Sequence, residues 1–416
     1  MKTLTKSFII LFALLNNSFA QPVSETVSMQ AQYQQQVFYN LENGIIKSES
    51  VTNWDIAFAV SGNGAAGSAI LLNETNATLW AYPGDTSEWS TFDTTNYSTW
   101  ERLLNTDTSW TNGAFNVYRG ANGMFDMGWG ILNPQNNYWT FGDSLYLIKL
   151  ADNSFKKLWI VSLKTGTWEF KYANVDGSNE QTITFNKNSY PNRNFVYFSI
   201  INNQLIDREP DNTTWELTFV KHTDYISYAN QYVGVTSVFS NVNVWSAKGN
   251  YPDFVTANAA TSPQTAFTKN INNIGREWKK YSSANGWEVY DTIAYFVNNL
   301  DSTKLFRIVF TGFGGMANGD TYFDIEEITT TSLDEKLSFI NFEFYPNPAN
   351  ENINIRVSDN VNHLQANILD ITGKTLKTSL LINTLNELYV GDLPSGIYLL
   401  QLLTDKEQIT KKLIIE

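Results

Sequence analysis

Hydrophobic and polar residues alternate with a period of two along much of the chain. Three successive stretches rich in β-branched and aromatic residues show it, at residues 145–150, 157–163 and 167–172. Between them lie Ala151-Asp152-Asn153-Ser154 and Lys164-Thr165-Gly166, whose residue types favour turns. The pattern predicts a meander of antiparallel strands, each with one face in a core.

The same pattern returns later, with turn residues at Asn299–Ser302 and a longer glycine-rich stretch at Gly312–Gly315. Only Ser98–Leu104 and Asn273–Ser282 have the pattern of a helix. We therefore expect an all-β protein.

Two blocks of sequence occur twice, in the same order. Residues 37–58 read VFYNLENGIIKSESVTNWDIAF, and residues 198–219 read FSIINNQLIDREPDNTTWELTF, so that Asn53 is matched by Thr214, 161 positions later (214 − 53). Further on, residues 146–163 are echoed by residues 295–312. Such repeats indicate a duplicated module. We expect two tandem antiparallel β-domains, at residues 30–185 and 186–332.

The first twenty residues have the features of a signal peptide. Lys2 and Lys6 precede an apolar run at Phe8–Leu15, and Ser18-Phe19-Ala20 supplies small residues before a cleavage site between Ala20 and Gln21. The apolar run is far shorter than the ~20 residues that span a bilayer, and no later segment is long enough. We expect export and no membrane-spanning segment.

Composition narrows the class of protein. The chain has 416 residues, which suggests two to four domains of roughly 100–200 residues. Its formal net charge of −13 opposes binding to nucleic acid or to an anionic membrane surface, so we expect neither partner. Because the chain has no cysteine, it lacks disulfides and thiol chemistry, and its stability must come from core burial.

A third unit follows the Thr-rich join at 329–332. It contains YPNPA (345–349), DITGK (370–374) and LPSGIYLLQL (393–402), and it ends on KKLIIE. Together these motifs resemble the type A C-terminal sorting domain of the type IX secretion system, across residues 338–416. The resemblance implies a small immunoglobulin-like β-sandwich and, as a partner, the type IX secretion machinery. It also implies a Bacteroidetes-type cell, removal of the tail and a protein attached to the cell surface or released.

The duplicated module also resembles a known family. TNWDIAF, the glycine-rich loop at 61–67, the segment Asn273–Trp278 with its looser counterpart Asp126–Trp129, and the hairpin YLIKLADNSFKKLWI are similar to the HmuY family of secreted haem-binding β-proteins. The resemblance covers roughly residues 35–185 and 190–330. It implies that each copy grips a flat hydrophobic ligand such as haem in a cleft.

The haem ligands implied by that family are incomplete in this chain. Side chains of His, Met, Cys or Tyr hold haem iron, and the family's best-known member uses two histidines. Here His222 follows the second WELTF strand and His363 lies in the tail, so no domain supplies a pair. Met124 and Met127 offer thioether ligation, with Trp129, Tyr138 and His222 as further candidate contacts. The alternatives are that the methionines fill core gaps and that His222 is a hydrogen-bonded strand-end residue. Met316 is a weaker candidate.

Three apparent motifs predict no chemistry. The glycines at 62–67 match a dinucleotide fingerprint, but residues 68–72 read as a strand where such a site needs a helix, so we expect a loop with left-handed backbone. Asp55 and Glu216 occupy equivalent places in the two copies, and we expect each to satisfy nearby backbone or turn groups rather than form an acid–base pair. No nucleophile elbow or calcium loop is present. We expect no catalysis and no metal site.

Aromatic residues crowd the middle of the first copy, among many Asn and Gly residues: Trp80, Tyr82, Trp89, Trp100, Trp110, Tyr118, Trp129, Tyr138 and Trp139. Rings and amides suit sugar faces as well as a porphyrin, although strands also favour Trp and Tyr in a core. The leading hypothesis is a secreted, non-enzymatic surface protein that captures haem or a related porphyrin. The alternative is a surface protein that binds glycans or another protein without haem ligation.

Overall fold

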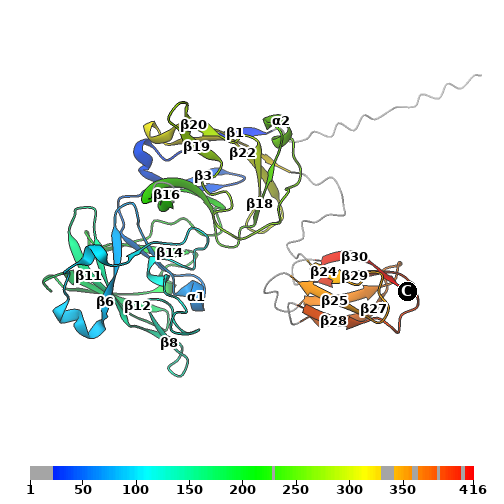
Figure 1. Cartoon of the computed structure of the whole chain (residues 1–416), viewed down its shortest axis with the longest axis horizontal. Helices are drawn as coiled ribbons and strands as arrows, with labels where there is room; N and C mark the ends of the chain where they lie inside the picture. Colours follow the sequence, from blue (N-terminus) through cyan, green and yellow to red (C-terminus); the bar gives the residue numbers. More distant parts are fainter. Residues whose placement is uncertain (1–21, 227–229, 329–341, 358–363, 382–384, 404–407) are drawn as a thin grey trace, which may run out of the picture. The chain divides into compact units, whose positions relative to one another are not determined.

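The computed structural model describes residues 22–226, 230–328, 342–357, 364–381, 385–403 and 408–416. The signal-peptide prediction, with Ala20 and Gln21, and His363 lie outside these residues. The chain divides into two compact units, one up to residue 329 and one from residue 330. Almost all regular structure is β, which confirms the predicted fold class (Figure 1). None of the helices in the described residues has the length and apolar character that a membrane crossing needs.

The first lobe of the larger unit contains residues 56–206. Its eight-stranded sheet has the order β13-β12-β11-β10-β6-β7, with β8 and β9 attached to β11. These strands are β6 (Thr78–Asp85), β7 (Arg102–Leu103), β8 (Gly130–Asn133), β9 (Trp139–Gly142), β10 (Ser144–Lys149), β11 (Phe155–Lys164), β12 (Thr167–Asn174) and β13 (Gln181–Asn186). A second sheet has the order β15-β14-β4-β5, from β4 (Ile56–Ala59), β5 (Ile70–Leu72), β14 (Phe195–Ser199) and β15 (Gln204–Ile206).

The second lobe is built from residues 23–50 and 217–327. One sheet has the order β1-β23-β22-β21-β18, from β1 (Val23–Ser28), β18 (Ser246–Asn250), β21 (Ile293–Asn298), β22 (Leu305–Phe313) and β23 (Asp320–Glu327). The other has the order β17-β16-β2-β3, from β2 (Gln35–Asn40), β3 (Gly44–Ser50), β16 (Leu217–Ile226) and β17 (Gln231–Ser240). A separate hairpin joins β19 (Lys279–Ser282) to β20 (Gly286–Val289).

The two repeats exchange their first segments. The WDIAF strand β4 pairs with β14 of the second repeat, with Phe58 opposite Val196. The WELTF strand β16 pairs with β2 of the first repeat, with Phe219 opposite Val37. Residues 23–50 therefore complete the second lobe, and Figure 1 shows β1 and β3 there beside β16 and β22, while β14 lies with β6 and β12. The predicted domain boundary between residues 185 and 186 follows the sequence repeat, whereas the sheets combine strands from both repeats.

Polar and aromatic side chains beside β4 and β16 also join the first repeat to the second. The Asp55 carboxylate accepts a hydrogen bond from the Ile200 backbone N–H (2.7 Å). The Glu216 carboxylate accepts one from the Leu41 backbone N–H (3.0 Å). The predicted role of these two acids as backbone acceptors is confirmed. Likewise, Trp54 packs edge-on against Tyr197 and Trp215 against Phe38, with ring centroids 4.8 and 5.0 Å apart.

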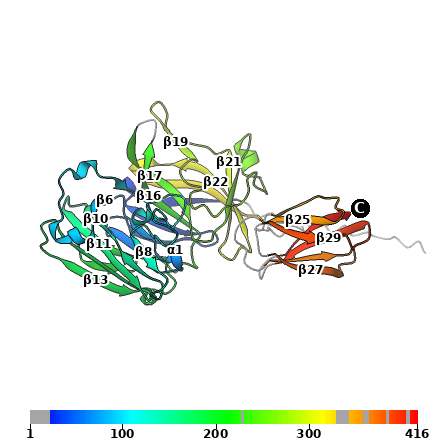
Figure 2. The ribbon, with the colours of Figure 1, turned by 60° about the horizontal axis from the view of Figure 1, so that its bottom comes forward.

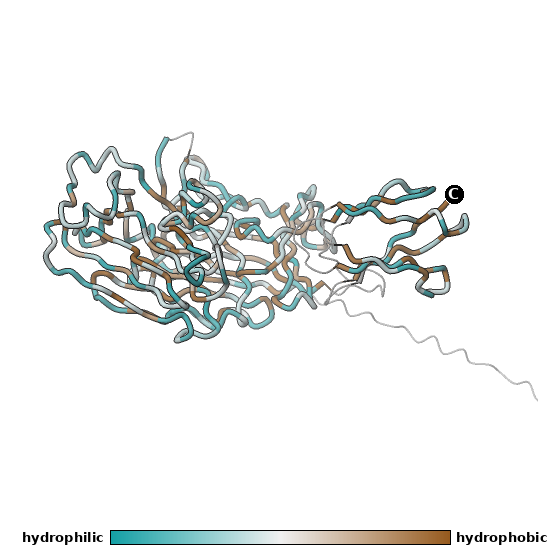
Figure 3. Tube along the Cα trace, turned by 90° about the horizontal axis from the view of Figure 1, so that it is seen from below, coloured by the Kyte–Doolittle hydropathy of each residue, from teal (hydrophilic) through white to brown (hydrophobic). Residues whose placement is uncertain are grey.

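Each lobe has its own core. Phe58, Trp168 and Phe198 belong to the first, and Phe219, Tyr295 and Phe323 to the second. Figure 3 shows hydrophobic and hydrophilic positions interspersed along the strands of the chain. Because alternate side chains point to opposite faces of a strand, this pattern buries one face of many strands, whereas β4 and β14 are buried on both faces.

Both predicted helices are wrong. Residues 97–99 form only a single 3₁₀ turn, and β7 follows directly. In 273–282, Gly275 has a φ of +58°, which an α-helix cannot contain, and Lys279–Ser282 is strand β19. The glycine-rich loop has left-handed residues at Gly62 and Gly64 and leads, through the single turn α1 (Gly64–Gly67), to strand β5 as predicted. The other short helix is α2 (Phe254–Ala257).

The C-terminal unit is a sandwich of two antiparallel sheets. One contains β24 (Phe342–Tyr345), β25 (Asn352–Val357) and β28 (Leu385–Tyr389). The other has the order β27-β26-β29-β30, from β26 (Leu364–Leu369), β27 (Thr375–Leu381), β29 (Gly396–Leu403) and β30 (Gln408–Ile415). Ile355, Ile368 and Leu400 are among its buried core residues. In the DITG turn, Asp370 accepts a hydrogen bond from the Thr372 backbone N–H (2.8 Å).

Candidate ligand-binding site

The predicted methionine pair is divided between core and surface. Met127 is buried in the first lobe, where its sulfur accepts a hydrogen bond from the Ser68 hydroxyl (3.3 Å). Trp129 is fully buried beside it and donates from Nε1 to the Ser68 carbonyl (2.9 Å). Met124, in contrast, is 84 % exposed. The two sulfurs therefore face different surroundings, and the position of Met127 fits the alternative that it fills the core.

His222 lies at a cavity between the two lobes. Its Nε2 is hydrogen-bonded to the Ser237 hydroxyl (2.8 Å), and its ring packs on Phe239. Burial disfavours the imidazolium and lowers the pKa of His222. Ser237 is itself buried and is not part of the cavity wall, so this Ser–His contact does not present a nucleophile to a ligand.

The cavity itself is small, about 70 Å³, which is room for a few waters. Glu74 on its wall accepts backbone hydrogen bonds from Asn105 of the first lobe (2.6 Å) and Thr223 of the second (2.7 Å). The Asp107 carboxylate accepts a hydrogen bond from the side-chain amide of Asn272 (2.7 Å). These polar groups join the lobes to each other, and burial raises the pKa of Glu74 to about 7.

Most aromatic residues of the crowded region in the first lobe pack on one another. Tyr82 stacks on Phe92 with centroids 4.3 Å apart, and Trp100 packs edge-on against both. Trp110 donates from Nε1 to the Ser240 carbonyl of the second lobe (2.7 Å). Of the nine aromatic residues singled out in the sequence, Tyr138 is the most exposed, at 69 %. Of these nine residues, Tyr138 is therefore the strongest remaining candidate for contact with a ligand.

A group of aromatic side chains on the β19–β20 hairpin was not predicted from the sequence. Tyr281 and Trp287 are cross-strand partners with ring centroids 5.4 Å apart, and they are 67 % and 39 % exposed. Phe313 of β22 packs edge-on behind Trp287 at 4.9 Å. Met316, the weaker candidate in the sequence, is 62 % exposed in the adjoining loop. We call Tyr281, Trp287 and Phe313 the ring platform.

Close backbone contact and a buried cation hold the ring platform from below. A Cβ added to Gly315 would lie 2.6 Å from Trp287 Nε1, so only glycine allows the loop to approach the indole. Lys279 is buried under the hairpin, where Nζ donates to the Thr236 carbonyl (2.8 Å) and lies 4.0 and 4.8 Å from the ring centroids of Trp278 and Phe313. Burial lowers the pKa of Lys279 to about 7.

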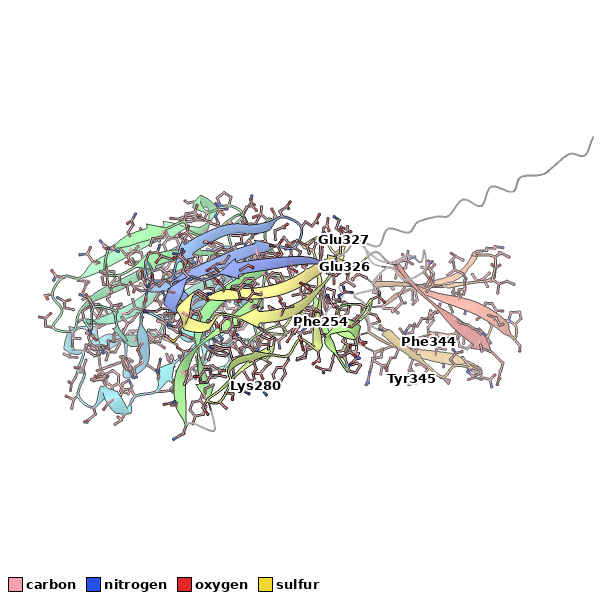
Figure 4. The ribbon with its side chains drawn as sticks, turned by 90° about the horizontal axis from the view of Figure 1, so that it is seen from above. Phe254, Lys280, Glu326, Glu327, Phe344 and Tyr345 are labelled. Carbon is pink, nitrogen blue, oxygen red and sulfur yellow. The ribbon has the colours of Figure 1, made fainter. Side chains whose placement is uncertain are left out.

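Polar side chains lie on the other face of the hairpin. Lys280, labelled in Figure 4, forms an ion pair with Glu288 (2.9 Å). Glu288 also accepts a hydrogen bond from the Asn285 amide (2.6 Å). Because adjacent residues of a strand point to opposite faces, these polar groups and the rings of Tyr281 and Trp287 lie on opposite faces of the hairpin.

The first lobe has a hairpin at the matching place in its sequence. In the sequence, β8 and β9 lie between the buried residues Trp129 and Tyr146, and β19 and β20 lie between the buried residues Trp278 and Tyr295. The two residues of each pair are 17 positions apart (146 − 129; 295 − 278). Tyr138 and Trp287 are each nine residues after these tryptophans (138 − 129; 287 − 278). Figure 2 labels β8 in one lobe and β19 in the other. This spacing is the sequence signal that could have found Trp287.

The family match lies in the tail. Residues 343–416 match the family described as the secretion system C-terminal sorting domain. The sorting domain predicted at 338–416 is thereby confirmed, and it directs the protein through type IX secretion to the cell surface or the outside. No curated protein matches the chain. The resemblance of residues 35–185 and 190–330 to the HmuY family stays a prediction.

Two solved structures show weak similarity. One is PorZ, an essential bacterial surface component of the type IX secretion system of Porphyromonas gingivalis, at 10 % identity over 68 % of this chain and 44 % of PorZ, with a TM-score of 0.17. Dimeric latent PorU from the same organism has 11 % identity over 95 % of this chain and 34 % of PorU, with a TM-score of 0.17. The chain spans less than half the length of either protein. Similarity at this level carries no argument about fold or function.

Proposed function

We propose that the protein is an exported, non-enzymatic glycan-binding protein that uses the ring platform of the β19–β20 hairpin. The observation that carries the proposal is the exposure of Tyr281 and Trp287 in contact with each other, in a chain that buries Trp129, Trp168, Trp215 and Trp278 completely. Large rings left in water lose the free energy that burial would supply. A ligand with an apolar face recovers it.

The chemistry around the rings favours a sugar over other apolar ligands. The C–H face of a sugar ring can stack on Trp287 or Tyr281, and the Tyr281 hydroxyl offers a donor and an acceptor to the hydroxyls of the sugar. Export to the cell surface places the ring platform where extracellular glycans occur.

Haem is the less favoured ligand. Iron in haem needs axial side chains, and the candidates predicted for that role are divided: Met127 lies in the core, Met124 on the surface, and His222 beside a cavity that holds only a few waters. We also favour binding over glycoside hydrolysis. Hydrolysis uses two flanking carboxyl groups, and Glu288 is the single carboxylate within residues 279–289.

The proposal is tested by screening the purified full chain on a glycan array and then titrating the best soluble oligosaccharide calorimetrically. Trp287→Ala removes the central ring, and we expect it to weaken binding about tenfold or more, the loss of one stacking contact of about 1.4 kcal/mol. Tyr225→Ala is the matched control because Tyr225 is 46 % exposed on another hairpin. The ring platform would be rejected as the site if Trp287→Ala matched the unmodified chain both in affinity and in the number of oligosaccharides bound per chain.

A further inference from the structure

The turn between β8 and β9 in the first lobe combines three unusual features. Tyr138 is 69 % exposed. Asn137 and Tyr138 both have left-handed backbone, with φ of 52° and 56°. A bulky residue seldom adopts this conformation, and such strain persists where the surrounding structure imposes it, often at functional sites.

Hydrogen bonds fix this turn and leave its side chains available. The Asn133 side chain accepts from the Gln135 backbone N–H (3.0 Å), and the Asn136 carbonyl accepts from the Trp139 backbone N–H (2.9 Å). Behind the turn, Trp139 Nε1 donates to the Thr165 hydroxyl (3.1 Å). The side-chain amides of Gln135, Asn136 and Asn137 have no hydrogen-bond partner among the described residues.

An apolar shelf borders the turn. The Phe125 carbonyl accepts a hydrogen bond from the Leu132 backbone N–H (2.9 Å), which holds the turn that carries Met124 and Phe125 against β8. Met124 and Phe125 are 84 % and 41 % exposed. Phe141 of β9 is 37 % exposed as well. Exposed rings and a thioether therefore lie on β9 and on the turn that is held against β8.

We infer that the Tyr138 turn is a second carbohydrate-binding site, suited to hydroxyl-rich sugars. This inference rests on the proposed glycan-binding function, but not on the ring platform being its site. Amides offer a donor and an acceptor each, which matches a hydroxyl, while the Tyr138 ring offers a stacking face. Residues 133–141 themselves contain no charged side chain, and the nearby charge at Phe141 is that of Lys164, whose Nζ lies 5.1 Å from the ring centroid.

Two sites in one compact unit would make the protein bivalent. Linked sites raise the avidity for a repeating glycan far above the affinity of either site alone, by 10²–10⁴ where the geometry allows both to engage. A polysaccharide chain or a glycan-coated surface presents such repeats. A single soluble oligosaccharide does not gain in this way, and this difference makes the two sites separable in experiment.

The test uses the full chain and its Tyr138→Ala, Trp287→Ala and double variants, with the best neutral oligosaccharide from the array as a soluble probe and the same glycan at high density on a sensor surface. We expect calorimetry to give two oligosaccharides per chain, and one for each single variant. On the dense surface we expect each single variant to dissociate at least tenfold faster than the unmodified chain. Tyr138→Trp keeps a ring and should retain both properties.

The outcomes separate the two proposals. If Tyr138→Ala leaves both the stoichiometry and the dissociation rate unchanged while Trp287→Ala weakens binding, the second site is rejected and the ring platform stands. If only Tyr138→Ala weakens binding, the Tyr138 turn stands and the ring platform is rejected. If the unmodified chain binds no glycan, both fail. Tyr138→Gly separates folding from binding, because glycine adopts left-handed backbone freely. It should preserve or raise the melting temperature while losing one site, and retention of both sites would overturn the inference.

Discussion

The Glu216 carboxylate accepts a hydrogen bond from the backbone N–H of Leu41, 175 residues earlier in the chain. Asp55, at the matching place in the first repeat, instead accepts from Ile200 of the second repeat. The β2–β3 hairpin of the first repeat thus pairs with β16 of the second repeat, and the β14–β15 hairpin of the second repeat pairs with β4 of the first. Each lobe is therefore completed by strands from the other repeat.

The exchange predicts how the protein responds to loss of its N-terminal segment. Deleting residues 22–50 removes β1, β2 and β3, so that β16 and β23 each lose a neighbouring strand. We expect hydrogen exchange to accelerate in β16 and β23 while β4 and β14 keep their protection. Increased exchange in β4 with protected β16 would instead support lobes that follow the sequence repeats.

The two methionines should differ sharply in their contribution to stability. Met127→Ala leaves a cavity in the core of the first lobe, and we expect the free energy of unfolding to fall by about 2–5 kcal/mol. Met124→Ala changes an exposed side chain and should alter it by less than about 0.5 kcal/mol. Urea unfolding measures both. A Met124→Ala variant as destabilised as Met127→Ala would show that the 120–126 turn packs differently.

Lys279 predicts a pH dependence of stability. Burial lowers its pKa from the usual 10.5 to about 7, so between these values the unfolded chain binds more protons than the folded one. Stability contributed by this group therefore rises with pH from about 7 to about 10.5. We expect Lys279→Met to flatten that rise in urea unfolding across this range. Lys280→Met, on the exposed side of the hairpin, is the control and should leave it intact.

Gly315 allows a test of how the ring platform is positioned. Its φ is +64°, and an alanine Cβ would collide with the Trp287 indole, so Gly315→Ala should displace the ring and weaken glycan binding several-fold. Gly44→Ala is the matched control. Gly44 also has a positive φ, +78°, but no atom lies within 4 Å of the added Cβ. Gly44→Ala should lower the free energy of unfolding by about 1–2 kcal/mol and leave glycan binding unchanged. A binding loss in both variants would point to general destabilisation.

Local features of the fold could be predicted from the sequence, and pairing between distant segments could not. Alternation identified the strands, and turn residues identified the β10–β11 hairpin and the tail. The exchange was hidden because Val37 and Val196 lie in strands of similar apolar pattern, so either strand could pair with Phe58 or Phe219. Periodicity shows which positions share a face, but not which face is covered. Met127 and Met124 were therefore grouped although one is buried, and Trp287 was missed although it is exposed.

Calorimetric titration of the full chain and its Trp287→Ala variant with the best array glycan tests the central claim most directly. The account predicts saturable binding by the unmodified chain and one bound oligosaccharide fewer in the variant, because the affinity of the ring platform falls by about tenfold or more, at an unchanged melting temperature. No glycan binding by the unmodified chain, together with a Soret shift on haemin addition that Met124→Ala or Met127→Ala abolishes, would contradict it and restore haem as the ligand.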